Sequence, residues 1–195
     1  MIELPSPTLD GAVSLEAAIA KRRSVRELAP TALTMEQIGQ LAWAAQGITD
    51  EETGHRAAPS AGATYPLELY LVTPERLLHY IPDGHKAERL SEEDVRPKLR
   101  AAGWRQGTIA QAPLVIVMAA VRERTAARFG DRATRYVHIE AGHVGQNVQL
   151  QAVALGLASV PLGVSDDDGR VRGALGLPED QEIVYVVCVG HAREE

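Results

Sequence analysis

The sequence predicts a protein of mixed class, α+β or α/β with a mixed sheet, on three observations. Helical and strand patterns alternate along the 195 residues, so neither an all-helical nor an all-strand fold accounts for them. Leu114 to Met118 is a continuous apolar run, which is typical of a strand buried on both faces. Apolar residues from Ala133 to Leu155 recur at spacings of three and four, which predicts a long helix.

The first quarter of the chain predicts an extended arm followed by two helices. Residues 1–13 contain Pro5, Pro7 and Gly11 and favour an extended conformation. Ser14 is placed to cap a helix that ends near Arg22 to Arg26. Thr34, with a glutamine three residues later, is a capping-box pattern that begins a second helix ending near Gly47.

The middle of the chain predicts a long loop, two strands and further helices. Residues 48–64 are small and polar and form the loop, whose length is typical of functional loops. The elements expected after it are strands at 67–72 and 77–81, a turn at 82–84, a helix that begins at Ser91–Asp94 and runs to Ala102, and a less distinct helical piece at 104–110.

The long helix is the clearest element of the second half. About 24 residues would give a length of about 36 Å, and Gly156 follows as a C-terminal cap. Gly142 and Gly145 remove bulk from it and permit close approach of another helix or a ligand. A strand and turn at 157–163, a short helix at 166–175 and a buried strand at 183–189 complete the prediction.

Composition narrows the class of protein. Hydrophobic residues make up 45% and charged residues 24%, as in ordinary soluble proteins, and no linker divides residues 1–195, which predicts a single domain. The net charge of -6 argues against a nucleic-acid binder. No apolar run reaches the ~20 residues of a membrane span, and the N-terminus lacks the pattern of a signal peptide. We therefore expect a cytoplasmic protein that contacts neither nucleic acid nor membrane.

Several catalytic and cofactor motifs are absent from the sequence. It contains no P-loop, no Gly-x-Gly-x-x-Gly and no Gly-x-Ser-x-Gly. Glu140 and His143 form one Glu-x-x-His unit, but di-iron proteins need two such units and further carboxylates, so a helix-surface or interface pair is the better interpretation. The single cysteine, Cys188, lies in an apolar strand and is expected to be a core residue without a redox role.

Three short stretches carry chemistry that could bind a ligand. Arg22-Arg23-Ser24-Val25-Arg26 offers guanidiniums that suit a phosphate, but a solvated helix end explains it equally well. Residues 58–63 form a loop without bulky side chains, whose backbone can approach a planar ligand; an ordinary surface turn is the alternative. Residues 160–164 follow a predicted strand, so their amides could be aimed at a ligand from a fixed scaffold.

Together, four ordered motifs resemble those of FMN-dependent nitroreductases over roughly residues 14 to 193. The arginine stretch at 22–26 is similar to their first motif and Pro59 to Pro66 to their second. The Gly-Ala-x-Tyr-Pro form of the second motif, and Glu140 to His143 followed by Gln146-Asn147, resemble the branch that contains azoline (thiazole and oxazole) dehydrogenases. Pro161 to Gly163 and Gly190-His191 also fit the family pattern.

The resemblance implies an α+β three-layer sandwich, with a mixed, mostly antiparallel sheet flanked by helices and a long central helix at a homodimer interface. Two FMN sites would be shared between the chains, and NADH or NADPH would reduce the flavin in a ping-pong cycle. No protein side chain would act as a catalytic nucleophile. The residues carried over to cofactor binding are Arg22, Arg23, Ser24 and Arg26, then Pro59, Ser60, Ala61, Gly62 and Ala63 from the partner chain, then Pro161, Leu162 and Gly163, and finally Arg193 as a second phosphate clamp.

One departure from the azoline dehydrogenases bears on function. Where they carry a Lys-Tyr pair before a glycine, this chain has Arg128-Phe129-Gly130, and neither side chain can accept a proton at neutral pH. The chain is also too small to include a separate peptide-docking domain. The sequence therefore favours a stand-alone oxidoreductase that reduces nitroaromatic or quinone-like acceptors. A dehydrogenase that tailors a peptide or small molecule in a natural-product pathway, and a non-catalytic flavin-binding or structural dimer, remain the alternatives.

Overall fold

A seven-stranded sheet forms the centre of the computed structural model, which describes residues 1–102, 107–163 and 168–193. Neighbouring strands in it pair antiparallel, as the resemblance predicted for most of the sheet. The strands lie in the order β1 (Ile2–Glu3), β6 (Lys86–Ser91), β5 (Leu77–Ile81), β4 (Leu67–Val72), β7 (Leu114–Ala120), β9 (Glu182–Gly190) and β8 (Ala158–Leu162).

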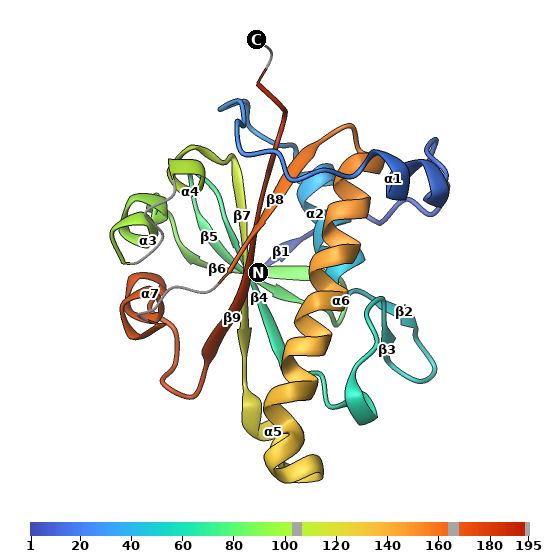
Figure 1. The fold of residues 1–195 in the computed structure, drawn as a ribbon, viewed down its shortest axis with the longest axis vertical. Helices are drawn as coiled ribbons and strands as arrows, with labels where there is room; N and C mark the ends of the chain where they lie inside the picture. Colours follow the sequence, from blue (N-terminus) through green and yellow to red (C-terminus); the bar gives the residue numbers. More distant parts are fainter. Residues whose placement is uncertain (103–106, 164–167, 194–195) are drawn as a thin grey trace.

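Helices cover both faces of this sheet and give three layers, which confirms the predicted α+β sandwich (Figure 1). One face carries α1 (Leu15–Lys21), α2 (Met35–Gln46) and α6 (Ala133–Ala154). The other carries α3 (Arg96–Ala102), α4 (Gly107–Gln111) and α7 (Asp168–Leu175). None of the described helices unites the length and the hydropathy of a membrane span.

The sheet divides the apolar interior into two cores because successive side chains of a strand point to opposite faces. Leu69 and Leu71 of β4 pack under α2 and α6, while Tyr70 of the same strand packs under α3, α4 and α7. Every residue of β7 is buried, so the predicted two-faced burial of the run beginning at Leu114 is confirmed. The buried sheet is therefore the scaffold to which the surrounding loops are attached.

The predicted helix caps are present. Ser14 Oγ accepts a hydrogen bond from the Ala17 amide at 3.2 Å and begins α1. Thr34 and Gln37 form the reciprocal capping box of α2, whose C-terminal cap is Gly47. Each side chain satisfies an amide that the first helical turn leaves without a backbone partner.

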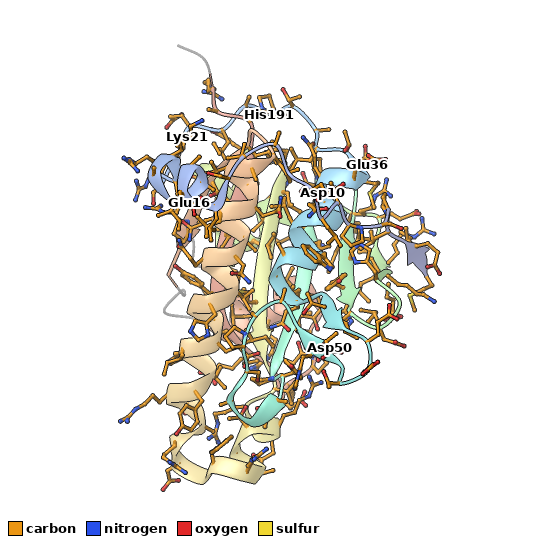
Figure 2. All side chains as sticks on the ribbon, turned by 90° about the vertical axis from the view of Figure 1, so that its right-hand side faces the viewer. Asp10, Glu16, Lys21, Glu36, Asp50 and His191 are labelled. Carbon is orange, nitrogen blue, oxygen red and sulfur yellow. The ribbon has the colours of Figure 1, made fainter. Side chains whose placement is uncertain are left out.

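Helix α6 is the predicted long helix, with 22 residues and a length of about 33 Å. The stripe from Ala133 to Ala152 is buried against the sheet and α2. At Gly145 an added Cβ would lie 2.6 Å from the Tyr185 ring, so that glycine permits close packing inside the chain. At Gly142 a Cβ would meet nothing within 4 Å. Figure 2 views this outer side, with Glu16 and Lys21 beside the upper, carboxyl end of α6.

Several elements differ from the sequence prediction. The loop at 48–64 contains a small hairpin of β2 (Ile48–Asp50) and β3 (His55–Arg56), and the 3₁₀ turn η1 (Ala61–Ala63). Ser91 ends strand β6, which was not predicted, and α3 begins at Arg96, so the helix start expected at Ser91–Asp94 is wrong.

Other differences lie at the ends of predicted elements. The extended arm at 1–13 includes β1, which pairs with β6. Helix α5 (Arg122–Phe129) and the 3₁₀ turn η2 (Gly130–Arg132) precede α6 and were also not predicted. Trp104, Val164 and the helix start expected at Asp166 lie outside the described residues.

Candidate functional site

The arginine stretch, residues 22–26, follows directly from the end of α1 and runs beside the outer strand β8. Arg22 is the C-terminal cap of α1. Ser24 forms a parallel bridge with Ser159, and the Val25 amide donates to the Ser159 carbonyl at 2.9 Å. The backbone of the stretch is therefore attached to the sheet, while its side chains remain at the surface.

The guanidiniums of the stretch have few protein partners. Arg22 Nη1 donates to Gln149 Oε1 at 3.3 Å, and Arg23 Nη1 donates to the carbonyls of Ala20 and Arg22 at 3.0 and 2.7 Å. Among the described residues, neither these two nor Arg26 forms an ion pair with a carboxylate. Since each guanidinium has five N–H donors, most of this donor capacity can serve an anion.

Arg193 lies beside the same stretch. The Arg193 amide donates to the Glu27 carbonyl at 3.0 Å, and its Nη1 is 3.9 Å from Glu27 Oε2. Both side chains are largely exposed, so this ion pair is weak. Arg193 is therefore near the predicted phosphate site, but it already has a carboxylate neighbour.

The third predicted segment ends the strand that anchors the arginine stretch. Pro161 and Leu162 are the last residues of β8, three or fewer positions beyond Ser159, and Gly163 follows at the surface. Residues 22–26 thus run beside the outer strand β8, with 161–163 at the carboxyl end of that strand and Arg193 beyond the opposite end of the β8–β9 pair. Val164, which the sequence grouped with them, lies outside the described residues.

The second predicted motif, Pro59 to Pro66, forms a tight loop that we call the motif loop. Its backbone has positive φ angles at Gly62 (58°), Ala63 (54°) and Tyr65 (42°). Two of these residues carry side chains, for which that conformation costs on the order of 1–2 kcal/mol. Such backbone persists only where the surroundings fix it, and it is concentrated at functional sites.

Several contacts fix Tyr65 in this conformation. Its amide donates to Ser60 Oγ at 2.9 Å, and its hydroxyl accepts the Arg56 amide at 3.2 Å. The Arg56 guanidinium lies 4.3 Å from the centre of the Tyr65 ring. From the other side, Arg124 Nη1 donates to the Tyr65 carbonyl at 3.1 Å. The side chains of Ser60 and Tyr65 are thus used to shape the loop.

Beneath the motif loop lies a buried polar network centred on Glu140, which is 2% exposed. Gln46 Nε2 donates to Glu140 Oε1 at 3.3 Å, and Arg56 Nη1 donates to Gln46 Oε1 at 3.1 Å. Burial raises the pKa of Glu140, and the hydrogen bonds from Ser60 and Gln46 only partly offset that effect. The network joins helices α2 and α6 to the loop.

This network corrects part of the prediction for Glu140 and His143. His143 is exposed whereas Glu140 is buried, so a helix-surface pair is wrong, and an interface pair stays a prediction. Within the described ranges, no group of three or more His, Cys, Asp or Glu residues could hold a metal ion. Cys188 is fully buried in β9, where burial raises its thiol pKa to about 12, so the predicted core position is confirmed.

Side chains of helix α5 form hydrogen bonds to the motif loop. Arg128 Nη1 donates to the Gly62 carbonyl at 2.9 Å, and the Thr125 and Thr64 hydroxyls are 2.9 Å apart. Arg124 pairs with Glu68, whose Oε1 is 2.5 Å from Nη2. The sequence identified Arg128 as a departure from the azoline dehydrogenases, but it gave no sign of these long-range contacts.

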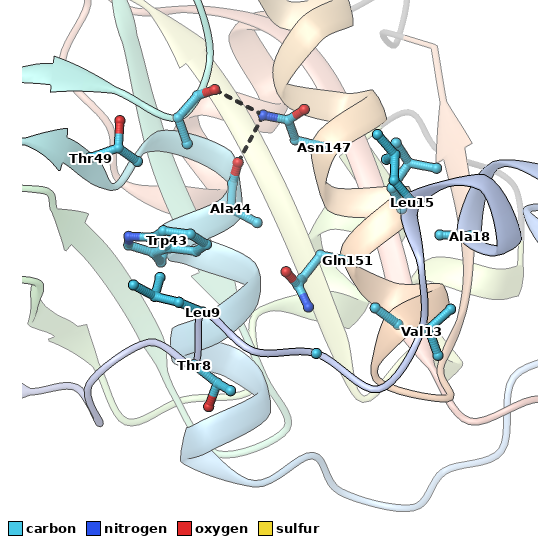
Figure 3. A pocket seen from close by; sticks show the side chains of 14 residues that line it. Thr8, Leu9, Val13, Leu15, Ala18, Trp43, Ala44, Thr49, Asn147 and Gln151 are labelled. Carbon is cyan, nitrogen blue, oxygen red and sulfur yellow. Dashed lines mark hydrogen bonds between the residues drawn. The ribbon is translucent and has the colours of Figure 1, made fainter.

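Within one chain, the motif loop and the arginine stretch contact different parts of α6. Glu140, under the motif loop, and Gln149, bonded to Arg22, are nine positions apart on α6, which is about 13 Å along the helix axis. A groove of about 510 Å³ lies between the N-terminal arm, α2 and α6 (Figure 3), with Asn147 bonded to the Ala44 and Ala57 carbonyls at its side. No residue predicted to bind cofactor lines this groove.

Comparison with known proteins gives consistent matches. The model of the Nitroreductase family matches residues 19–191. A candidate nitroreductase of Methanocaldococcus jannaschii is 42% identical over 184 residues, covering 91% of each chain. The crystal structure of a candidate nitroreductase from Ralstonia eutropha superposes with a TM-score of 0.89 at 26% identity, over 100% of this chain and 90% of that one.

Two more distant structures share the fold alone. The Escherichia coli microcin synthetase McbBCD complex, with a truncated pro-microcin bound, gives a TM-score of 0.76 at 20% identity, over 98% of this chain and 78% of that one. NADPH:FMN oxidoreductase from Vibrio harveyi gives 0.69 at 21% identity, over 92% and 69%. With the family match over most of its length and the archaeal relative, the chain belongs to the nitroreductase family of oxidoreductase enzymes.

Proposed function

We propose that this protein is an FMN-dependent oxidoreductase that takes electrons from NADH or NADPH and reduces nitroaromatic or quinone-like acceptors. The observation that carries the proposal is the arginine stretch, where three guanidiniums lie together without a carboxylate partner among the described residues. The relative from Vibrio harveyi is named for FMN and NADPH, which supports this choice of cofactor and donor. We also propose that residues 1–195 form one domain and that the protein is cytoplasmic.

The residues present fit an FMN phosphate and ring. Arg22, Arg23 and Arg26 supply charge-assisted, potentially bidentate donors, which suit a phosphate dianion. Gly62 and Ala63 are exposed and small, so the motif-loop backbone can approach a flat ring closely. When bound, FMN accepts a hydride from the donor and passes electrons to the acceptor.

The chain's own groups would orient the flavin and balance its charge. Ser24 adds a hydroxyl beside the guanidiniums, and the backbone at Leu162 and Gly163 is our proposed source of amide donors toward the ring. Such donors stabilise negative charge that develops on a reduced ring in a protected site. Arg193 is a weaker phosphate ligand in this scheme because Glu27 competes for it.

We also propose that a homodimer completes each site. The motif loop and the arginine stretch are about 13 Å apart along α6, so a second chain can supply the missing half of the site. The outer side of α6 and its surroundings expose apolar side chains that a partner can cover: Leu9, Leu15, Ile19 and Ile139 are 76, 61, 55 and 49% exposed. Light scattering after size-exclusion chromatography should give twice the chain mass of 21.0 kDa.

The decisive experiment is anaerobic reduction of the purified protein. We expect a yellow protein with flavin absorbance that either NADH or NADPH bleaches, followed by reoxidation on addition of a nitroaromatic or quinone. A colourless protein that does not bind added FMN contradicts the proposal. Bound FMN that neither nucleotide reduces would instead identify a non-catalytic flavin-binding protein.

A dehydrogenase of peptide or small-molecule natural products is the second candidate. The shared fold of the microcin synthetase complex favours it. Against it, Arg128 and Phe129 replace the Lys-Tyr pair, and Arg128 is engaged with the Gly62 carbonyl. Oxidation of an azoline-containing peptide by the purified protein, with no need for a nicotinamide donor, would support this candidate over the first.

A further inference from the structure

Helix α5 and the start of α6 concentrate positive charge in an acidic protein. Residues 122–135 contain five arginines and two acidic residues, whereas the whole chain has a net charge of -6. Arg124 is committed to Glu68, but among the described residues Arg122, Arg128, Arg132 and Arg135 form no ion pair with a carboxylate. Such unneutralised charge raises the local concentration of anions.

Two of these arginines are ordered against aromatic rings. Phe129 and Tyr136 meet edge to face with their centres 4.9 Å apart. The Arg128 guanidinium lies 5.5 Å from the Phe129 ring, and that of Arg132 lies 5.7 Å from both rings. We call these four residues the arginine–aromatic cluster. A guanidinium stacked on a ring keeps its edge donors available and loses little freedom when it binds an anion.

The cluster adjoins the motif loop. Arg128 reaches the Gly62 carbonyl at 2.9 Å and also lies over Phe129, so it connects the loop to the cluster. A donor bound over a flavin beside the loop would therefore lie next to the arginine–aromatic cluster. The sequence contains no Gly-x-Gly-x-x-Gly motif, so the usual dinucleotide-binding loop does not explain how such a donor would be held.

We propose that the arginine–aromatic cluster binds the 2′-phosphoadenosine end of NADPH and makes NADPH the preferred donor. This inference rests on the proposed flavin site. Phe129 and Tyr136 are half-buried, so the ring surface that the guanidiniums leave exposed can contact the adenine. Arg132, whose Nη1 donates to the Tyr136 hydroxyl at 3.3 Å, and Arg128 beside it offer their remaining donors to the 2′-phosphate. NADH lacks that phosphate and gains nothing from the guanidiniums.

The test compares donors in two matched variants. In Arg132→Gln we expect kcat/KM for NADPH to fall about tenfold, as for loss of a charge-assisted contact, with the value for NADH and the FMN content unchanged. Arg122→Gln removes the same charge at the start of the preceding helix α5 but touches none of the four residues, and it should behave like the wild type. In the wild type, 2′-AMP should compete with NADPH more strongly than 5′-AMP does.

Four outcomes overturn the inference. Three concern the donor: equal use of NADH and NADPH by the wild type, equal losses in both variants, or inhibition by 5′-AMP that matches inhibition by 2′-AMP. The fourth is a loss confined to carboxylated nitroaromatic acceptors, with NADPH unaffected. Each of these results leaves a yellow, reducible protein and so leaves the proposed function intact. Failure of the proposed function is distinct, because the protein would then lack FMN or resist both donors.

Discussion

The arginine stretch and the motif loop differ in how the protein holds them. The stretch is fastened by its backbone to Ser159, and its guanidiniums have sparse contacts. The motif loop is fixed through its side chains, with Glu140 buried beneath it and Arg124 and Arg128 bonded to its carbonyls. The difference indicates two tasks: donors kept available for an anion, and a backbone shape maintained against strain.

The largest expected effect comes from the arginine stretch. Arg22→Ala combined with Arg26→Ala removes two of the proposed phosphate ligands, each expected to contribute about 1.5–3 kcal/mol. FMN affinity should fall by a factor on the order of 10² or more, while stability changes less, because Arg26 is exposed and half-buried Arg22 forms one long hydrogen bond, to Gln149 at 3.3 Å. Flavin content after purification and FMN titration measure the effect. Unchanged flavin content would place the phosphate site elsewhere.

For the motif loop we expect the main effect on stability and not on FMN affinity. Glu140→Ala leaves Gln46 and Ser60 without a buried hydrogen-bond partner, so we expect a loss of about 2 kcal/mol in the free energy of unfolding. Urea unfolding followed by circular dichroism measures it. A loss below about 0.5 kcal/mol, the range of ordinary surface substitutions, would show that the network does not hold the loop.

A smaller effect is expected from Gly62→Ala. The new methyl group would lie 2.7 Å from Arg128 Nη1, and φ at this position is +58°. The backbone strain costs about 1 kcal/mol, and FMN binding should weaken as the loop shifts. Gly54→Ala is the control, because Gly54 also has a positive φ (+71°) but has nothing within 4 Å. Equal FMN affinities in the two variants would contradict a ligand-facing loop.

The smallest effect is a pH dependence. The pKa of Glu140 is raised above 4.5 in the folded state, mainly by burial, so the folded protein binds the proton more tightly than the unfolded chain. Its stabilising contribution is complete below the unfolded pKa and is lost as the pH rises through the folded one. Glu140→Gln removes this dependence, so the wild type should lose stability relative to the variant as the pH rises above 4.5. A difference in Tm between the wild type and Glu140→Gln that does not change with pH would contradict this prediction.

Elements with strong local signals could be predicted, and those without them could not. Thr34 and the apolar stripe of α6 predict their helices from the sequence alone. Helix α5 buries only Thr125, and β6 buries only Ala87, so neither shows a hydrophobic period. The strands of the β2–β3 hairpin are two and three residues long and mostly exposed, which leaves no pattern to detect.

In the candidate site, too, features with a local sequence signal could be predicted and those without one could not. The motifs that bring guanidiniums or small residues together within a few positions could be found in the sequence, and the structure places 22–26 beside the strand that ends in Pro161 and Leu162. The contacts that shape the motif loop join residues far apart in the chain: Gln46 meets Glu140 at a separation of 94 residues, and Arg128 meets Gly62 at 66. No local spacing encodes such pairs, so they required the fold.

The burial of Cys188 provides a built-in reporter of unfolding. As the chain's only cysteine, with no exposed surface and a thiol pKa of about 12, it is protected from thiol reagents while β9 stays in the sheet. Labelling by a maleimide then counts molecules in which that strand has opened. Mass spectrometry of timed labelling therefore compares opening rates of the wild type and variants, with and without FMN, and no cysteine has to be introduced for it.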